Sequence, residues 1–223
     1  MNTNNVLNSG SLPQHRPSHE ISMGTIPRLT YDGSFNGFLT AIWHNRKQNQ
    51  GAQASIQAQQ AQQASIFENN HFVLANQAIA QKLWHELDQR PRPSARMVYF
   101  AFLSEKSYLI QGLFQLLSQP NFKEATVDPE LYEELLKASQ EVEREKRKWE
   151  GQIQMSKDNS SLWFAELNPR FNIMPLLSLH LKKRYAGSDW FLWDNKRKYG
   201  LLCRQGQCTF TKKRMNLRSA LAS

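Results

Sequence analysis

The chain lacks the sequence features that identify several common classes of protein. Its two cysteines, Cys203 and Cys208, are too few for a disulfide framework or a four-cysteine zinc site. The six histidines are spread along the chain, and none lies close to a cysteine. There is also no glycine-rich phosphate loop and no nucleophile elbow. We therefore expect no metal site and no cofactor.

Long apolar runs are absent as well. The longest, Met97–Leu103, is far shorter than the ~18–20 residues that cross a bilayer. The first residues, MNTNNVLNSGSLPQ, lack the charged and apolar regions of a secretory signal. We expect a cytoplasmic protein that does not enter a membrane. In that compartment the two cysteines should be reduced, although their CRQGQC spacing also permits a small disulfide-closed loop.

Acidic residues are outnumbered in only one part of the chain. Residues 1–139 carry 11 Lys+Arg and 11 Asp+Glu, whereas residues 140–223 carry 17 and 8. The whole net charge of +9 therefore belongs to the C-terminal part. Such an excess favours a polyanionic partner, because each neutralised phosphate releases bound counterions. A solvated basic surface without a partner is the alternative.

Composition divides the chain into three parts. Residues 1–27 are rich in Asn, Ser and Pro without periodicity, which is typical of a disordered tail. Residues 28–203 are expected to form a single α+β domain, interrupted at 48–65 by a low-complexity Gln/Ala insertion. Because that insertion has almost no apolar side chains to bury, we expect a flexible or weakly helical linker there. Residues 204–223 form a basic tail.

Periodicity predicts a helical N-terminal two-thirds packed with a small, mostly antiparallel sheet in the C-terminal part. The expected strands after the helices cover 152–157, 162–167, 190–194 and 199–203. A helix with Asn172 as its cap and Pro175 in its first turn separates the second and third of these strands and ends at Gly187. The other expected helices cover 74–87, 95–105, 106–118 and 128–151.

The ordered part begins with a strand–turn–helix motif. Arg28–Tyr31 can form a short strand, and the sequence Asp32-Gly33 favours a turn after it. Ser34 is a suitable N-cap for a helix whose apolar face starts at Phe35. We expect positive φ at Gly33.

Basic and aromatic residues alternate in the C-terminal hairpin and in the helix before it. An aromatic strand from Trp190 to Asp194 turns through NKRK to its partner, which begins at Tyr199. Exposed rings can stack on unpaired bases while Lys and Arg hold phosphates, and each stacked base contributes ~1–3 kcal/mol. Both faces of the strand are apolar, so at least one tryptophan is expected in the core. The candidate nucleic-acid-binding residues are Lys182, Lys183, Lys196, Arg197, Lys198, Arg144 and Arg147.

The last two candidates lie on a strongly charged helix, EVEREKRKWEG. There Arg144 and Arg147 are interleaved with Glu143, Glu145 and Glu150. This pattern mostly indicates i,i+4 ion pairs on a solvated helix. A phosphate-contacting helix face is the alternative.

Three residues are weak candidates for catalysis. His180 lies on the apolar face of the helix before the hairpin, where a lone histidine is more often a core residue than a catalyst. Asp32 and Asp194 are the other two candidates. Arg184 shares the His180 side of the helix, and we expect it to be a structural partner of a carboxylate such as Asp194.

Three segments together resemble a known bacterial family. They are YDGSFNGFLTAIW at Tyr31–Trp43, AFLSE at Ala101–Glu105 and NIMPLLSLHLKKRYAGSDWFLWDNKRKYGLL at Asn172–Leu202. Over roughly Leu29–Leu202 the chain is similar to the "probable DNA metabolism protein" family, a domain of unknown function. The family's C-terminal helical segment is not matched by residues 204–223, which indicates a truncated or altered end. The matching order in the third segment is Pro175, Leu176, Leu177, His180, Arg184, Trp190, Asp194, Tyr199 and Gly200.

The resemblance implies a setting in DNA metabolism or repair. This domain is found fused to uracil-DNA glycosylase-like domains and is encoded beside a radical-SAM protein assigned to DNA repair. The resemblance therefore implies two partners: DNA, and either a uracil-DNA glycosylase-like domain or a radical-SAM protein. The leading hypothesis is a DNA-binding accessory module for that protein partner. The alternatives are an enzyme acting on damaged DNA or a modified base, and a protein–protein adaptor whose basic face docks an acidic partner.

Overall fold

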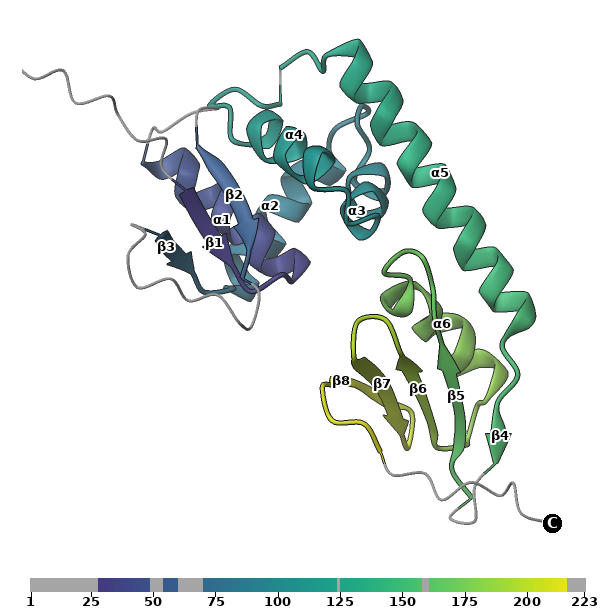
Figure 1. Ribbon diagram of the computed structural model, residues 1–223. Helices are drawn as coiled ribbons and strands as arrows, with labels where there is room; N and C mark the ends of the chain where they lie inside the picture. Colours follow the sequence, from purple (N-terminus) through teal and green to yellow (C-terminus); the bar gives the residue numbers. More distant parts are fainter. Residues whose placement is uncertain (1–27, 49–53, 60–69, 124, 158–160, 216–223) are drawn as a thin grey trace, which may run out of the picture.

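The computed structural model describes residues 28–48, 54–59, 70–123, 125–157 and 161–215, and it confirms the α+β class (Figure 1). The prediction for residues 1–27 lies outside this part of the chain. The helices are α1 (Phe35–Lys47), α2 (Gln77–Asp88), α3 (Ala95–Leu103), α4 (Ser107–Leu117), α5 (Pro129–Gln152) and α6 (Met174–Arg184). The strands are β1 (Arg28–Tyr31), β2 (Ser55–Ala58), β3 (Asn70–Val73), β4 (Ser156–Lys157), β5 (Trp163–Leu167), β6 (Trp190–Asp194), β7 (Tyr199–Arg204) and β8 (Gln207–Thr211).

The strand–turn–helix motif after β1 is confirmed. β1 is the central strand of a small parallel sheet with the order β2-β1-β3. Gly33 adopts φ +80°, a conformation that a residue without Cβ tolerates. The Ser34 hydroxyl caps α1 by accepting a hydrogen bond from the N–H of Gly37 at 2.9 Å. The Asp32 carboxylate accepts hydrogen bonds from both the N–H and the hydroxyl of Ser34.

The prediction of a flexible or weakly helical linker is wrong for part of the Gln/Ala insertion, because β2 lies within it. β2 pairs with β1 and places Ile56 beside Leu29. The carboxamide of Gln111 on α4 accepts from the N–H of Ile56 at 3.0 Å and donates to the carbonyl of Ala54 at 3.1 Å. Long-range partners thus satisfy the backbone of a segment that has few apolar side chains.

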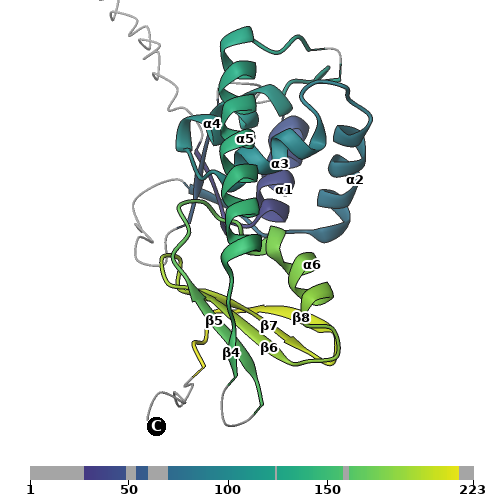
Figure 2. The same cartoon turned by 90° about the vertical axis from the view of Figure 1, so that its right-hand side faces the viewer.

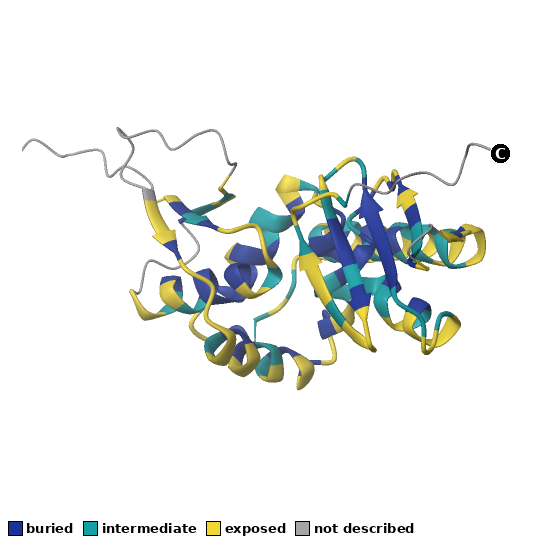
Figure 3. Ribbon diagram, turned by 90° about the horizontal axis from the view of Figure 1, so that it is seen from below, coloured by how far each residue is buried: buried dark blue, intermediate teal, exposed yellow. Residues whose placement is uncertain are grey.

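The C-terminal sheet has the order β4-β5-β6-β7-β8. β5 and β6 are parallel and α6 crosses between them, whereas the other neighbouring pairs are antiparallel. The mostly antiparallel sheet is therefore confirmed. Its central strands are buried (Figure 3). α6 covers one face of the sheet with Met174, Leu177 and Leu181.

The start of α6 differs from its prediction. Asn172 does not cap the helix, because the N-cap position is occupied by Ile173, which has no polar side chain. The carbonyl oxygen of the Asn172 side chain accepts a hydrogen bond from the Tyr199 hydroxyl instead. Pro175 lies in the first turn as predicted, and Gly187, at φ +76°, follows the end of the helix.

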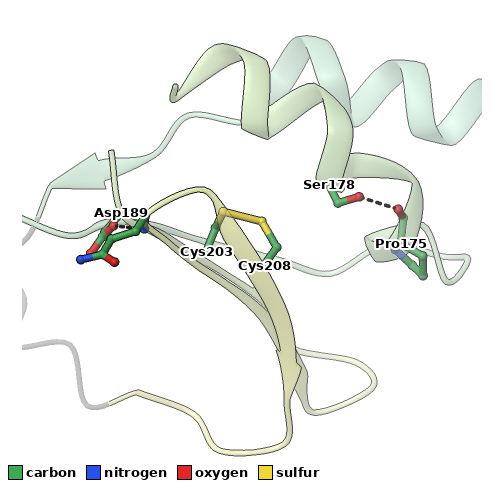
Figure 4. Close-up of a disulfide and its surroundings, with 6 residues drawn as sticks. Pro175, Ser178, Asp189, Cys203 and Cys208 are labelled. Atoms are coloured by element: carbon green, nitrogen blue, oxygen red, sulfur yellow. Dashed lines mark hydrogen bonds between the residues drawn. A yellow bond between two sulfur atoms is a disulfide. The ribbon is translucent and has the colours of Figure 1, made fainter. Parts of the chain in front are cut away.

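The sheet continues past the predicted boundary at Cys203. β8 pairs with β7 in a register that places Cys208 opposite Cys203, and the two cysteines form a disulfide (Figure 4). The expectation of a reduced pair is wrong, because directly opposed residues of an antiparallel hairpin have their Cβ atoms only ~4.5–5.5 Å apart. The predicted basic tail, residues 204–223, therefore contains an edge strand at Gln207–Thr211.

α5 connects the two parts of the fold. It begins at Pro129, and Asp128 caps it by accepting a hydrogen bond from the N–H of Leu131, as predicted. The helix runs from beside the N-terminal helices down to the sheet (Figure 2). One continuous cluster of buried residues spans both parts. Among the described helices, none has the length and hydropathy needed to cross a membrane.

Candidate nucleic-acid interface

The β6–β7 turn carries three candidate cations, Lys196, Arg197 and Lys198. Arg197 is not exposed, since only 10% of its side chain is accessible. Its guanidinium pairs with the carboxylates of Glu105 at 2.6 Å and Asp194 at 3.0 Å. Burial lowers the pKa of Arg197, but the hydrogen bonds and charges of these carboxylates outweigh burial and leave the pKa raised. Arg197 therefore fastens the turn to the α3–α4 junction and is not free to hold a phosphate.

Asp194 is fully buried and structural. Its Oδ1 accepts hydrogen bonds from the backbone N–H groups of Lys196 at 2.8 Å and Arg197 at 3.0 Å. Its Oδ2 accepts from the Arg197 guanidinium. Arg184 is not its partner, contrary to the prediction, because the β5–α6–β6 crossover separates the end of α6 from the end of β6. The Arg184 guanidinium donates to the backbone carbonyl of Glu150 at 3.5 Å.

The two basic clusters predicted from the sequence lie at opposite ends of the C-terminal sheet. Lys196 and Lys198 follow the C-terminal end of β6. Lys182 and Lys183 lie in the last turn of α6, shortly before β6 begins. All four lysines are exposed. The helix and the turn therefore do not form one phosphate-binding surface.

The tryptophans of β6 are not available for base stacking. Trp190 and Trp193 expose 1% and 3% of their surface and belong to clusters on opposite faces of the sheet. Gly200 packs against Phe191, and a Cβ there would lie 2.6 Å from a ring carbon. Burial raises the pKa of the Tyr199 hydroxyl. Trp190, Tyr199 and Gly200, which belong to the family pattern, are therefore packed inside or against the sheet.

The three catalytic candidates are not assembled into a site. Asp32 belongs to the turn before α1, His180 to α6 and Asp194 to the end of β6, and no hydrogen bond joins any two of them. His180 is half-buried, and its Nε2 has no hydrogen-bond partner among the described residues. In the part of the chain that the structure describes, no group of three or more His, Cys, Asp or Glu side chains is placed to hold a metal ion.

A basic and aromatic surface forms where β5 begins and α6 ends. The Lys157 ammonium lies 5.8 Å from the centroid of the Trp163 ring. The Trp163 ring centroid lies 5.5 Å from that of Tyr185, and the Arg184 guanidinium lies 5.8 Å from the Tyr185 centroid. Both rings are half-buried. We call this row the Trp163 face and include in it the exposed Lys182 and Lys183, which precede Arg184 in the last turn of α6.

The carboxylates of Asp189 and Glu150 have partners outside the Trp163 face. Asp189 accepts a hydrogen bond from the backbone N–H of Gln205 at 2.9 Å (Figure 4). Glu150 pairs with Lys146 at 3.0 Å. Within the described ranges, no carboxylate forms an ion pair with a cation of the Trp163 face. These cations are therefore available to an external anion.

Sequence reasoning missed Lys157, Trp163 and Tyr185. One signal was present, because a register for the predicted 152–167 hairpin would have placed Lys157 opposite Trp163, as observed. The contact between Trp163 and Tyr185 has no local signal, since it depends on the α6 crossover.

The α5 candidates form no distinct phosphate site. The Arg147 guanidinium lies 2.8 Å from the carboxylate of Glu143, so the predicted i,i+4 pairing is found here. Arg96 shares the same carboxylate at 2.6 Å. The hydrogen bond from Arg147 is the main reason that the pKa of Glu143 is lowered. Arg144 is exposed and pairs with no carboxylate of the described residues.

Comparison with known sequences identifies the family. The profile of the family described as a domain of unknown function (DUF4130) matches residues 104–220, more than half of the chain. The chain therefore belongs to this family, and the recognised resemblance to a domain of unknown function is confirmed. The matched segment includes the whole Trp163 face and the β6–β7 turn. No curated protein and no solved structure matches the chain.

Proposed function

We propose that the chain is a DNA-binding module that contacts unpaired DNA through the Trp163 face. The observation that carries the proposal is the row Lys157, Trp163, Tyr185 and Arg184, in which two half-buried rings lie between two cations. Proteins that bind single strands combine aromatic platforms with a basic groove, because every base has a face that can stack. The Trp163 face has aromatic rings and cations on adjacent elements.

The charge distribution supports the same proposal. The C-terminal part carries the net charge of the chain, and four of its cations, Lys146, Arg147, Arg197 and Arg214, are paired with carboxylates. Lys182, Lys183 and Arg184 are exposed and have no carboxylate partner among the described residues. Neutralising phosphates with such groups releases counterions and favours binding at low salt.

The family resemblance supports an accessory role. A glycosylase-like or radical-SAM partner would supply the chemistry, and this module would hold the strand near that partner. The absence of an assembled catalytic group among Asp32, His180 and Asp194 is consistent with such a division of labour. Phosphate contacts position a nucleic acid without reading its sequence, so we expect little sequence preference.

The test is a titration of a labelled single-stranded oligonucleotide by fluorescence anisotropy at several salt concentrations. The variant K182A/K183A removes two cations of the Trp163 face. If both contact phosphates, the slope of log K against log salt should fall by about 1.4, from roughly 0.7 per single-strand contact. Trp163→Leu keeps apolar bulk but removes the stacking platform, and it should weaken binding with little change in slope.

The matched control is K196A/K198A, which removes two exposed lysines from the opposite end of the same sheet. This variant should keep the wild-type affinity and slope. Equal slopes for K182A/K183A and the wild type, or a larger loss in K196A/K198A, would refute binding through the Trp163 face. Thermal melting of the two lysine double variants should be unchanged within about 0.5 kcal/mol, because exposed charges contribute little to stability.

A further inference from the structure

A small pocket lies in the N-terminal part, away from the Trp163 face and lined by α1, α2 and α3. Its volume is about 300 Å³, at the lower end of the range for ligand pockets. Leu39 and Ala80 contribute apolar surface. Phe35, Trp84 and Tyr99 supply aromatic walls. The pocket has room for one flat ring system and little more.

Two of the three pairs of aromatic rings meet edge to face, and the third pair is tilted. The centroids of Phe35 and Trp84 lie 5.6 Å apart with an interplanar angle of 82°, and those of Trp84 and Tyr99 lie 6.2 Å apart at 78°. Phe35 and Tyr99 lie 4.8 Å apart at 55°. Rings in such edge-to-face contact form walls with several orientations, so one ring face can stack on a ligand while another ring meets its edge.

The polar groups of the pocket are neutral and unpartnered. Asn36 and Gln81 line it, both are exposed, and neither side-chain carboxamide has a hydrogen-bond partner among the described residues. Each carboxamide offers a donor and an acceptor in one plane. No described residue that lines the pocket is charged. The pocket therefore suits an uncharged planar ligand whose edge carries both donors and acceptors.

We propose that this pocket binds a nucleobase. A nucleobase combines an aromatic face with a coplanar edge of donors and acceptors, and recognition by stacking plus side-chain hydrogen bonds is how extruded bases are held. The base can come from a free nucleoside or nucleotide, or from an unpaired position of a strand. The pocket does not share residues with the Trp163 face, so binding of a free base does not require that face.

Two lysines beside Trp43, one helical turn beyond a residue that lines the pocket, favour a nucleotide over a nucleoside. Trp43 follows Leu39 by one turn of α1, and its ring lies 4.7 Å from the ammonium of Lys82 and 5.5 Å from that of Lys47. Lys82 directly follows Gln81 on α2. A phosphate attached to the bound base would meet this positive charge.

The experiment is calorimetric titration of the full chain with uridine, adenosine and their 5′-monophosphates, and with ribose 5-phosphate as a probe that lacks a base. At least one nucleoside should bind saturably, its monophosphate should bind more tightly, and ribose 5-phosphate should not bind. The variant N36A/Q81A should weaken nucleoside binding about 25-fold, from roughly fivefold for each of two lost hydrogen bonds. Gln77→Ala removes an exposed carboxamide of α2 outside the pocket and should leave binding unchanged.

A parallel titration with a single-stranded oligonucleotide separates the two sources of the base. Saturable binding of the free compounds identifies a nucleoside or nucleotide site. A base from a strand is identified if the free compounds do not bind, yet N36A/Q81A weakens oligonucleotide binding in addition to the loss caused by K182A/K183A. The proposal is overturned if neither ligand form depends on Asn36 and Gln81. That result would not affect the proposal that DNA binds to the Trp163 face.

Discussion

Replacement of Arg197 tests the interpretation of the β6–β7 turn as a structural lock. Arg197→Ala leaves the fully buried Asp194 carboxylate without its only ion-pair partner among the described residues. Breaking a buried pair by removing one partner typically costs 3–5 kcal/mol. Two backbone N–H groups, from Lys196 and residue 197 itself, still donate to Asp194, so we expect a loss near the lower limit, about 3 kcal/mol.

Glu105 adds little to this estimate. Its side chain is 42% exposed, and water can solvate its carboxylate once Arg197 is gone. A loss of about 3 kcal/mol corresponds to a fall in Tm of roughly 6–12 °C for a domain of this size. Urea denaturation followed by circular dichroism measures the free energy of unfolding directly.

Two comparisons make the Arg197 result specific. Lys196→Ala, at the exposed neighbouring position, should change the free energy of unfolding by less than about 0.5 kcal/mol. Asp194→Asn in the Arg197→Ala background should recover part of the stability, because it removes the uncompensated buried charge. If Arg197→Ala unfolds at the wild-type urea concentration while losing DNA affinity, Arg197 is a phosphate contact and the structural interpretation is wrong.

Three further predictions follow from contacts in the N-terminal part and on α5. Gly33→Val should destabilise by at least about 1 kcal/mol, since a β-branched residue tolerates φ +80° poorly, and an unchanged Tm would contradict the turn. Gln111→Ala should cost roughly 1–3 kcal/mol, because it leaves the Ala54 carbonyl and the Ile56 N–H without partners; matched melting of Gln81→Ala, on an exposed surface, should show no loss. The pKa of Glu143 is lowered in the folded chain, so its contribution to stability is present above the ordinary glutamate pKa and is lost as pH falls through the lowered value. Glu143→Gln should flatten this acid limb of a Tm–pH curve, and an identical limb in the variant would contradict the assignment.

The parts of the fold that sequence reasoning predicted correctly depend on short-range signals. Gly33 and Ser34 set the turn and cap before α1 through contacts within three residues. Asp128 and Pro129 set the start of α5 in the same way. Turns and caps of this kind depend on neighbouring residues, so they can be predicted from the sequence alone.

The parts that were missed depend on residues far apart in the chain. β2 exists because Gln111 and β1 satisfy its backbone, although its own composition indicates a linker. Arg197 looks like an exposed turn cation, and its burial follows from Glu105, 92 residues earlier. The Trp163 face depends on two features together. The register of β4 with β5 places Lys157 opposite Trp163, and the path of α6 brings Tyr185 to the Trp163 ring. None of these pairings has a local signature in side-chain periodicity.

The most direct test of the central claim is lysine reactivity, read by mass spectrometry after brief acetylation with and without a saturating single-stranded oligonucleotide. DNA binding through the Trp163 face predicts that Lys157, Lys182 and Lys183 become protected, while Lys196 and Lys198 at the opposite end of the sheet keep their reactivity. Protection of the two turn lysines without protection of the other three would contradict it.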